Sequence, residues 1–269
     1  MDIIQSIILG IIQGAGEFLP ISSTAHLILI PYIFSWKDPG LSFDVALHLG
    51  TLISILAYFW KDWVEILKLG ASSLKITKYK TNSYLNNKSI FWLIIISTIP
   101  GAAAGFFLEE KAETVFRNPL LISLALASVG LILFLVDKYA KHKKEISDIN
   151  FKDAVIIGIS QAVAIIPGVS RSGATIISGL AMGLNRKDAA RFSFLLSAPI
   201  IFGASIFKLP GLFSEGISPS MFFGVIFSAV SGYLAIKYLL KFVEKSSYQV
   251  FFWYRLILAV IIAAFYFLK

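Results

Sequence analysis

The sequence predicts an all-α polytopic membrane protein with six transmembrane helices and two re-entrant helical hairpins, arranged as an inverted-topology repeat. The 269 residues are 57% hydrophobic with a mean hydropathy of +0.79, whereas soluble domains have an apolar share of about 45 to 50%. Several apolar runs approach the roughly 20 residues that cross a bilayer as a helix. Other runs are about half that length and flank breaks containing Pro and Gly, which indicates helices that enter the membrane and turn back.

The half-length runs form two pairs, and each pair predicts one hairpin. In the first pair the break contains QGAGEFLPISSTAH, residues 13–26, where Ser22, Ser23 or Thr24 is expected to cap the second half-helix. In the second pair the break spans 167–173. The half-length runs are 3–12, 25–34, 154–166 and 174–184. The full-length candidates are 41–60, 90–108, 120–136, 190–209, 221–240 and 251–268.

Charges in the connections set the predicted orientation. Connections 61–89 and 137–153 are rich in lysine and are expected to be cytoplasmic, whereas the acidic connection 109–119 is expected to lie outside. Lysines near 237–245 also fall inside if 154–184 is a hairpin and not a crossing. Each half then has three crossings, and an odd number inverts the second half. One integral membrane domain, 1–269, would contain repeats at about 1–136 and 150–269.

The two hairpins also match weakly in sequence. Gly10, Gln13 and Ser22 have the same mutual spacings as Gly158, Gln161 and Ser170, which places Ser23 opposite Arg171. The prediction of a repeat rests mainly on the number of membrane crossings in each half, and only secondarily on these three matched positions. Inverted repeats with helices broken at mid-membrane place a ligand site at the repeat interface.

Composition excludes several classes of function. The net charge of +8 lies in short connections and not along one face, so a nucleic-acid partner is not expected. With no Cys, the chain has no disulfide, no thiolate nucleophile and no Cys-ligated metal.

Ionisable residues inside apolar runs cost free energy and therefore indicate function. Glu17, His26 and Arg171 are such residues. They could pair with one another only to hold the hairpins together, but many hydroxyls accompany them. These hydroxyls belong to Ser22, Ser23, Thr24, Ser170, Ser172 and Thr175. The sequence thus predicts one polar pocket for a phosphorylated lipid.

A phosphate site is favoured over a carboxylate or sugar site. The half-helix after Gly173 and the one after 22–24 would both point their N-termini into the pocket, where free N–H groups and the dipole bind anions. The guanidinium of Arg171 suits phosphate oxygens.

Glu17 would repel phosphate if it stood beside it as a bare carboxylate. It would therefore hold a divalent cation, carry a proton, or pair with Arg171 in the empty site. Mg²⁺ or Ca²⁺ bridging Glu17 to a diphosphate is one interpretation, and Gln13, one helical turn earlier, offers the same ion an oxygen.

The nucleophile is left open between hydroxyl and imidazole. Ser23 is preferred, assisted by His26 or Glu17 and with Arg171 steadying the phosphoryl group, while Ser22 or His26 itself remain alternatives. His48 is expected to face a neighbouring helix and not the site.

Two long motifs resemble the undecaprenyl-diphosphatase family of bacterial membrane enzymes linked to bacitracin resistance. The first motif is matched by Gln13, Glu17, Pro20, Ser22, Ser23, Thr24 and His26, with Gln13 where many members have Glu. The second, PGxSRSGAT, is matched by Pro167, Gly168, Ser170, Arg171, Ser172, Gly173, Ala174 and Thr175.

The resemblance implies hydrolysis of undecaprenyl diphosphate to undecaprenyl phosphate and inorganic phosphate, which recycles the lipid carrier for peptidoglycan synthesis. It implies divalent-metal dependence, a bacterial cytoplasmic membrane location and a pocket opening to the outer, periplasmic face. Glu17, Ser23, His26 and Arg171 would be the essential set, and a homodimer would be allowed because dimers are known in the family. Substrate contacts would come from Ser22, Thr24, Gly168, Ser170, Ser172, Gly173 and Thr175.

Three other functions compete. A carrier that moves polyprenyl phosphate would share the inverted repeat. A lipid phosphatase of the two-histidine class is disfavoured because no His follows SRSG. A purely structural membrane protein would use its polar residues only to join helices.

Overall fold

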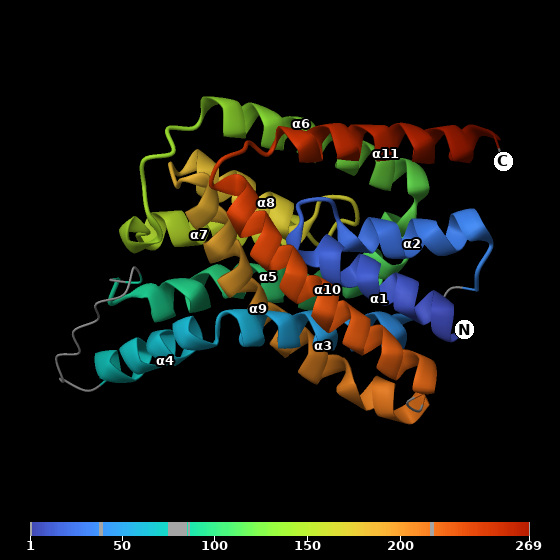
Figure 1. Cartoon of the computed structure of the whole chain (residues 1–269), viewed down its shortest axis with the longest axis horizontal. Coiled ribbons are helices and arrows are strands. Elements are labelled where there is room, and N and C mark those ends of the chain that lie inside the picture. Colours follow the sequence, from blue (N-terminus) through green and yellow to red (C-terminus); the bar gives the residue numbers. More distant parts are fainter. Residues whose placement is uncertain (1, 38–39, 75–84, 86, 216–217, 269) are drawn as a thin grey trace.

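The computed structural model describes residues 2–37, 40–74, 85, 87–215 and 218–268. Within these ranges the chain is helical, and a single isolated bridge pairs Lys144 with Leu184. Helices dominate the view in Figure 1, where both termini lie at the same end. The helices of the first half are α1 (Ile3–Phe18), α2 (Ser23–Phe34), α3 (Leu41–Tyr58), α4 (Trp60–Leu74), α5 (Ile90–Glu113), η1 (Val115–Arg117) and α6 (Pro119–Tyr139). Those of the second half are η2 (Ile146–Asp148), α7 (Phe151–Val163), α8 (Arg171–Ala181), α9 (Arg186–Glu215), α10 (Pro219–Val243) and α11 (Gln249–Leu268).

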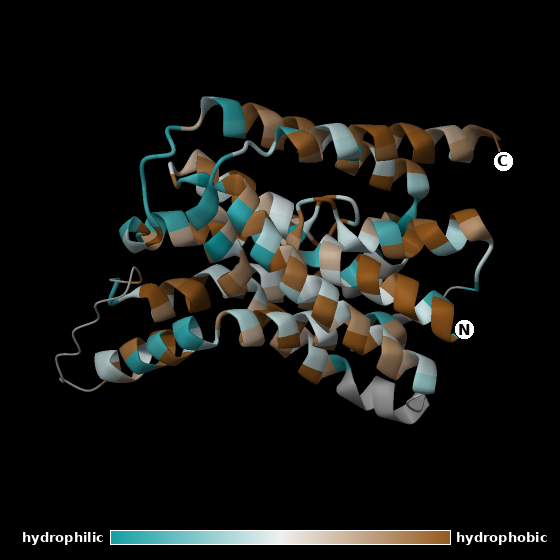
Figure 2. Cartoon of the chain, viewed as in Figure 1, coloured by the Kyte–Doolittle hydropathy of each residue, from teal (hydrophilic) through white to brown (hydrophobic). Residues whose placement is uncertain are grey.

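The helices have the lengths and surfaces of a multi-pass membrane protein. Among the described residues, five helices are long and apolar enough to cross a bilayer, and α3 with α4 makes a sixth if that bent pair is one broken span. Their outward faces remain apolar, with Val260 on α11 and Leu124 on α6 each 61% exposed. Figure 2 shows hydrophobic colour along these helices and hydrophilic colour in connections such as that after α6. An apolar exterior around buried polar groups is what lipid as solvent requires.

Both predicted pairs of short helices joined by a break are present, but the first break is shorter than expected and the second, residues 164–170, lies three residues earlier than expected. The first break was expected from Gln13 onward, but α1 continues to Phe18 and only 19–22 interrupt the helices. Gly14 stays helical because it packs against α10, where a Cβ would come within 2.3 Å of the Ser228 carbonyl oxygen. Tertiary contact thus outweighs the low helix propensity of glycine. Likewise α8 begins at Arg171, and not after Gly173 as predicted.

The connection after α3 also differs from the expectation. Residues 61–89 were predicted as a cytoplasmic connection, but α4 begins at Trp60 and runs at 80° to α3. The ring of Trp60 is 58% exposed. Lys75, Lys78 and Lys80, which contributed to the predicted orientation, lie outside the described residues.

The hairpins pack closely against spans of the opposite half of the chain. Helix α1 lies on α10, where Gly10 is so close to Gly224 that a Cβ would be 2.4 Å from its carbonyl oxygen. Helix α7 lies on α5, where a Cβ on Gly158 would be 2.8 Å from the carbonyl oxygen of Ser97. Small residues let membrane helices approach to this distance, and dispersion and Cα–H contacts then hold them. The contact of α1 with α10 therefore has a counterpart in the contact of α7 with α5, each joining the first helix of a hairpin to a long helix of the other half.

Hydrogen bonds fix the end of the bundle that carries the lysine-rich connections. Asp137 at the end of α6 accepts from Arg186 Nε at 2.6 Å and from the backbone N–H of Tyr248 at 2.9 Å. The Tyr248 hydroxyl donates to the carbonyl of Arg186 at 3.0 Å. Burial of this phenol raises the pKa of Tyr248. The ends of α6, α9 and α11 are therefore joined here.

Candidate active site

The two hairpin breaks share one backbone geometry. Ser22 and Ser170 are the N-caps of α2 and α8, with φ of 71° and 72°. Each side-chain oxygen accepts a backbone N–H three residues on, from Ala25 at 3.4 Å and from Gly173 at 3.1 Å. A positive φ strains a residue with a side chain by about 1 to 3 kcal/mol, which the surrounding structure must offset. Capping of the half-helix is one such compensation.

Hydrogen bonds join the two breaks directly. The N–H of Gly168 donates to Ser22 Oγ at 3.2 Å, and Ser172 Oγ donates to the carbonyl of Leu19 at 3.1 Å. Gly168 has φ of +96° and lies against α6, where a Cβ would be 2.7 Å from a carbonyl oxygen. Only glycine suits this position. The turn of one hairpin therefore rests on the turn of the other.

Arg255 of α11 hydrogen-bonds to the backbone of both breaks. Its side chain is 0% exposed, and its Nη1 donates to the carbonyl of Pro20 at 3.0 Å. Its Nη2 donates to Gly168 at 2.6 Å and Val169 at 3.1 Å, and its Nε to Leu126 on α6 at 3.0 Å. Broken helices leave carbonyls that lipid cannot satisfy, and this guanidinium satisfies three of them, in addition to the Leu126 carbonyl inside α6.

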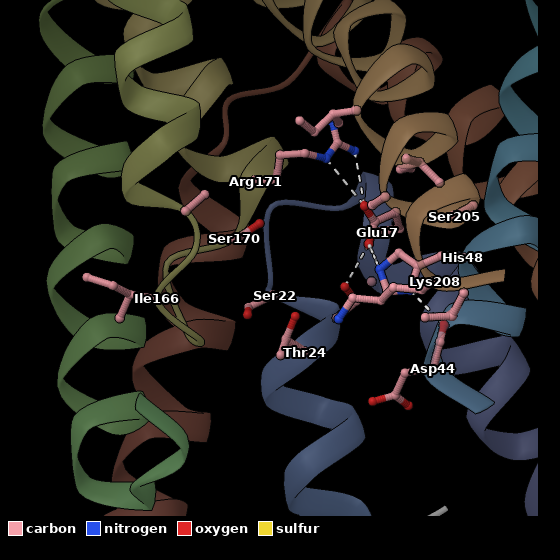
Figure 3. A pocket seen from close by; sticks show the side chains of 17 residues that line it. Glu17, Ser22, Thr24, Asp44, His48, Ile166, Ser170, Arg171, Ser205 and Lys208 are labelled. Carbon is pink, nitrogen blue, oxygen red and sulfur yellow. Dashed lines mark hydrogen bonds and ion pairs between the residues drawn. The ribbon is translucent and has the colours of Figure 1, made fainter. Parts of the chain in front are cut away.

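Glu17 stands at the centre of a charged cluster in front of the breaks (Figure 3). Its Oε1 accepts from Arg171 Nε at 3.3 Å and Nη2 at 3.2 Å. Its Oε2 accepts from Ser23 Oγ at 2.8 Å and from Gln13 Nε2 at 3.1 Å, and His48 Nε2 lies 3.7 Å away. The structure thus contains the Glu17–Arg171 pair that was one of the interpretations of the sequence. It also brings an acid, an alcohol and a guanidinium to one point.

A cavity of about 280 Å³ opens beside this cluster. The first residues of α2 and α8, Ser23 and Arg171, both line it, so the positive ends of two helix dipoles lie at its wall. Asp44 and Lys208 also line it, with Lys208 beside His48 in Figure 3. Of the predicted site residues, it is lined by Glu17, Ser22, Ser23, Thr24, Ser170 and Arg171.

Four predicted substrate-binding residues lie behind the cavity wall and support it. Gly168 makes the turn described above, and Ser172 is 0% exposed. A Cβ on Gly173 would be 3.1 Å from Arg255 Nη1. Thr175 Oγ1 is 2.7 Å from Ser193 Oγ and donates to the Arg171 carbonyl at 2.9 Å. These side chains hold the first turn of α8 in place.

His26 lies outside the lining of the cavity. Its Nδ1 donates to the carbonyl of Ser22 at 2.7 Å, so Nε2 of the neutral ring accepts the hydroxyl of Tyr254 at 2.6 Å. The two rings are stacked with centroids 5.7 Å apart. Among the described contacts, His26 makes no hydrogen bond with Ser23, the nucleophile it was expected to assist.

Comparison with known proteins places this architecture in a family. The family model described as bacitracin resistance protein BacA matches residues 6–261, which contain both hairpins and the whole cavity. The chain belongs to the BacA family.

Relatives of this BacA-family chain match it from end to end. The protein named undecaprenyl-diphosphatase of Moorella thermoacetica is 48% identical over 269 residues, covering 100% of both chains. That of Pelotomaculum thermopropionicum is 49% identical, covering 98% of this chain and 97% of the relative. That of Caldicellulosiruptor bescii is 49% identical, covering 100% and 99%.

The side-chain oxygens at the cluster suit a metal ion that protein and substrate would bind together. Glu17 offers a carboxylate, and Gln13 Oε1 is buried without a hydrogen-bond partner among the described residues. Three or more His, Cys, Asp or Glu side chains do not gather around any such point in the described part of the chain. The donors therefore fit a Mg²⁺ or Ca²⁺ that takes its other ligands from substrate phosphates and water, and they do not fit an all-protein cage.

The expectation for His48 was wrong, because His48 lines the cavity. Its Nδ1 donates to the carbonyl of Asp44 at 2.7 Å, which directs Nε2 toward Glu17. Arg255 was not among the predicted site residues. Both are ionisable residues inside apolar runs, so the signal that selected Glu17 was present for them too.

Proposed function

We propose that this BacA-family chain hydrolyses undecaprenyl diphosphate to undecaprenyl phosphate and inorganic phosphate, and so recycles the lipid carrier for cell-wall polymer synthesis. One observation carries the proposal. Ser23 Oγ donates to Glu17 Oε2 at 2.8 Å beside the Arg171 guanidinium, at a cavity inside a multi-pass membrane protein. Whole-length relatives named undecaprenyl-diphosphatase support the choice of substrate.

Ser23 acts as the nucleophile in this proposal, with Glu17 as its base. The hydroxyl already points at the carboxylate, so the proton passes to Glu17 as Ser23 Oγ bonds to the terminal phosphorus. The bond from that phosphorus to the bridging oxygen breaks, and undecaprenyl phosphate leaves. Water then cleaves the phosphoserine to inorganic phosphate, and Ser23 recovers its proton from Glu17.

Arg171 and two helix N-termini stabilise the transferring phosphoryl group. In the present state the Nε and Nη2 donors of Arg171 both contact Glu17, and Nη1 donates to the Ser193 carbonyl at 3.1 Å. An incoming phosphate competes for the same Arg171 donors, which releases Glu17 to act as a base. Charge on the equatorial oxygens then faces fixed donors in a site largely shielded from water.

A divalent cation completes the site as proposed. Glu17 and the side-chain Oε1 of Gln13 would hold it. It would neutralise charge on the leaving phosphate when bound. We expect chelation to stop phosphate release and Mg²⁺ to restore it. Gln13→Glu should lower the Mg²⁺ concentration that gives half-maximal rate, because a second carboxylate binds the ion more tightly.

The architecture behind the site is proposed to be an inverted repeat in one domain, with α3 and α4 as one broken span and with hairpins from opposite leaflets. It is supported by the paired contacts, α1 on α10 and α7 on α5, and by the matched caps Ser22 and Ser170. With the lysine-rich connection after α6 inside, the cavity residues Asp44 and Lys208 lie toward the outer face of the cytoplasmic membrane.

Phosphate release from undecaprenyl diphosphate by the purified protein in detergent tests the function. We expect release, with an acid-stable phosphoenzyme trapped at Ser23 and none in Ser23→Ala. An acid-labile phosphoenzyme at His26 would contradict the assigned nucleophile. Movement of lipid across vesicles without any phosphate release would contradict the enzyme and favour a carrier.

A further inference from the structure

The backbone carbonyl of Ser22 receives its short hydrogen bond from a side chain. The backbone N–H of His26, four residues on, reaches this carbonyl at 3.4 Å, whereas the imidazole Nδ1 of the same residue donates to it at 2.7 Å. In the second hairpin the carbonyl of Ser170 accepts the backbone N–H of Ala174 at 2.9 Å, an ordinary helical bond. An imidazole therefore completes the first turn of α2, where the backbone alone completes that of α8.

The Ser22 carbonyl belongs to the peptide unit that carries Ser23. This unit is planar, so a donor that fixes the carbonyl also fixes the N–H and the Cα of Ser23. Ser22 has φ of 71°, a strained value that a short hydrogen bond helps to maintain. From this backbone the Ser23 hydroxyl donates to Glu17 Oε2 at 2.8 Å. The imidazole of His26 thus holds the backbone that presents the proposed nucleophile.

The imidazole can hold this carbonyl only with a proton on Nδ1. A carbonyl oxygen only accepts, so Nδ1 donates, and Nε2 of the neutral ring then needs a donor. Tyr254 of α11 supplies it, because its hydroxyl lies 2.6 Å from Nε2 and its ring stacks on the imidazole at an interplanar angle of 16°. Without that hydroxyl, the ring could carry its proton on Nε2 and lose the bond to Ser22.

Neither ring lines the cavity. His26 is 7% exposed and Tyr254 is 43% exposed, and the cavity wall includes neither of them. Tyr254 directly precedes Arg255, whose Nη1 donates to the carbonyl of Pro20 in the same break. Consecutive residues of α11 therefore hold the first break at two points, one directly and one through His26.

We propose that Tyr254 is a positioning residue for the reaction. By donating to His26 Nε2 it keeps the imidazole proton on Nδ1, and the bond from Nδ1 to the Ser22 carbonyl aims the Ser23 hydroxyl at Glu17. His26 then acts through the backbone and takes no proton from Ser23. The proposal rests on the proposed function.

Removal of one hydroxyl tests this role. Tyr254→Phe keeps the stacked ring but leaves Nε2 without its donor. We expect kcat for undecaprenyl diphosphate to fall about tenfold, the factor that one hydrogen bond contributes, with KM unchanged because the hydroxyl does not touch the substrate. Tyr266→Phe is the matched control, since it removes a hydroxyl from the same helix outside the cavity lining, and it should leave kcat and KM unchanged.

Replacement of His26 separates positioning from chemistry. An asparagine amide places an N–H where Nδ1 stands, whereas a glutamine amide lies one bond farther out. His26→Asn should therefore turn over more than about tenfold faster than His26→Gln, because small displacements of a reacting group are costly. Asparagine needs no partner to keep its proton, so adding Tyr254→Phe to His26→Asn should change kcat by less than about twofold.

Three results would overturn the proposal while wild-type phosphate release left the proposed function standing. One is wild-type kcat in Tyr254→Phe. Another is the same tenfold loss from Tyr254→Phe in the His26→Asn background, which would show that the hydroxyl does not act through the imidazole. The third is equal inactivity of folded His26→Asn and His26→Gln, which would show that the imidazole itself takes part in the chemistry. Absence of phosphate release by the wild-type protein would instead refute the function, and this proposal with it.

Discussion

The two hairpin breaks have the same frame and different chemistry. Both are capped by a serine at positive φ, and Arg255 binds the carbonyl two residues before each cap, at Pro20 and at Gly168. The residue after the cap is Ser23 in the first hairpin and Arg171 in the second. Each hairpin therefore places a different functional group at the cavity from an equivalent position, a hydroxyl from the first and a guanidinium from the second.

The helices before the breaks repeat this contrast. Gln13 and Gln161 occupy matching positions, but Gln13 donates to Glu17 whereas Gln161 donates to the backbone carbonyl of Ser97 at 3.2 Å. Four residues after Gln161 stands Ile165, where the first hairpin has Glu17. Negative charge is therefore confined to one side of the interface and positive charge to the other. A symmetric frame can thus hold an asymmetric active site.

The largest expected effect comes from removing the charge of the first hairpin. Glu17→Gln preserves size and most hydrogen bonds but cannot take the proton of Ser23, so kcat should fall about 10³-fold, as for other general bases. Phosphate release by the purified variant measures this. Glu244→Gln is the matched control, since Glu244 is exposed and pairs with Lys187 away from the cavity. Near-normal turnover of Glu17→Gln would remove the carboxylate from the mechanism.

The second hairpin is tested by replacing the guanidinium of Arg171 with an ammonium, which keeps the positive charge. Arg171→Lys can no longer contact Glu17 and the Ser193 carbonyl together. We expect kcat/KM to fall about 10²-fold, comparable to losing one transition-state donor. Arg117→Lys, outside the lining of the cavity, serves as the control. Equal rates for the wild type and Arg171→Lys would show that charge alone suffices.

The stability of the folded protein should fall when Arg255, which hydrogen-bonds both breaks, is replaced. Arg255→Met leaves the carbonyls of Pro20, Gly168 and Val169 without this donor, which costs about 2 kcal/mol of stability. The thermal midpoint in detergent should drop, and Arg255→Lys should fall between Met and the wild type because it reaches fewer carbonyls. An unchanged midpoint in Arg255→Met would show that the breaks hold each other without it.

The smallest effect compares the two caps. Ser22→Ala and Ser170→Ala each lose a cap, and each thermal midpoint should reflect a loss of about 1 kcal/mol. Ser22→Ala should cost somewhat more, because Ser22 Oγ also accepts the N–H of Gly168. A larger cost for Ser170→Ala would contradict the idea that Ser22 connects the hairpins.

Much of this site was predictable from local sequence. Glu17 and Arg171 are costly in lipid unless paired, so their meeting in one polar cluster was predictable from hydropathy. The role of His26 did not follow, because spacing along α2 places it one turn from Ser23 but says nothing of Tyr254, which lies 228 residues away and turns the ring aside. The prediction for His48 was wrong for the same reason, since its contact with Glu17 joins two different helices.

Local sequence was enough to predict the apolar helices, the two breaks and the residue types that gather there, because hydropathy and Pro/Gly signals act over a few neighbouring residues. Local sequence could not predict that α1 runs on to Phe18, that Arg255 joins the breaks, or which of two histidines faces the cavity. Those outcomes depend on packing between segments far apart in the chain, where a glycine can be held helical by α10 and a ring can be turned by a distant hydroxyl.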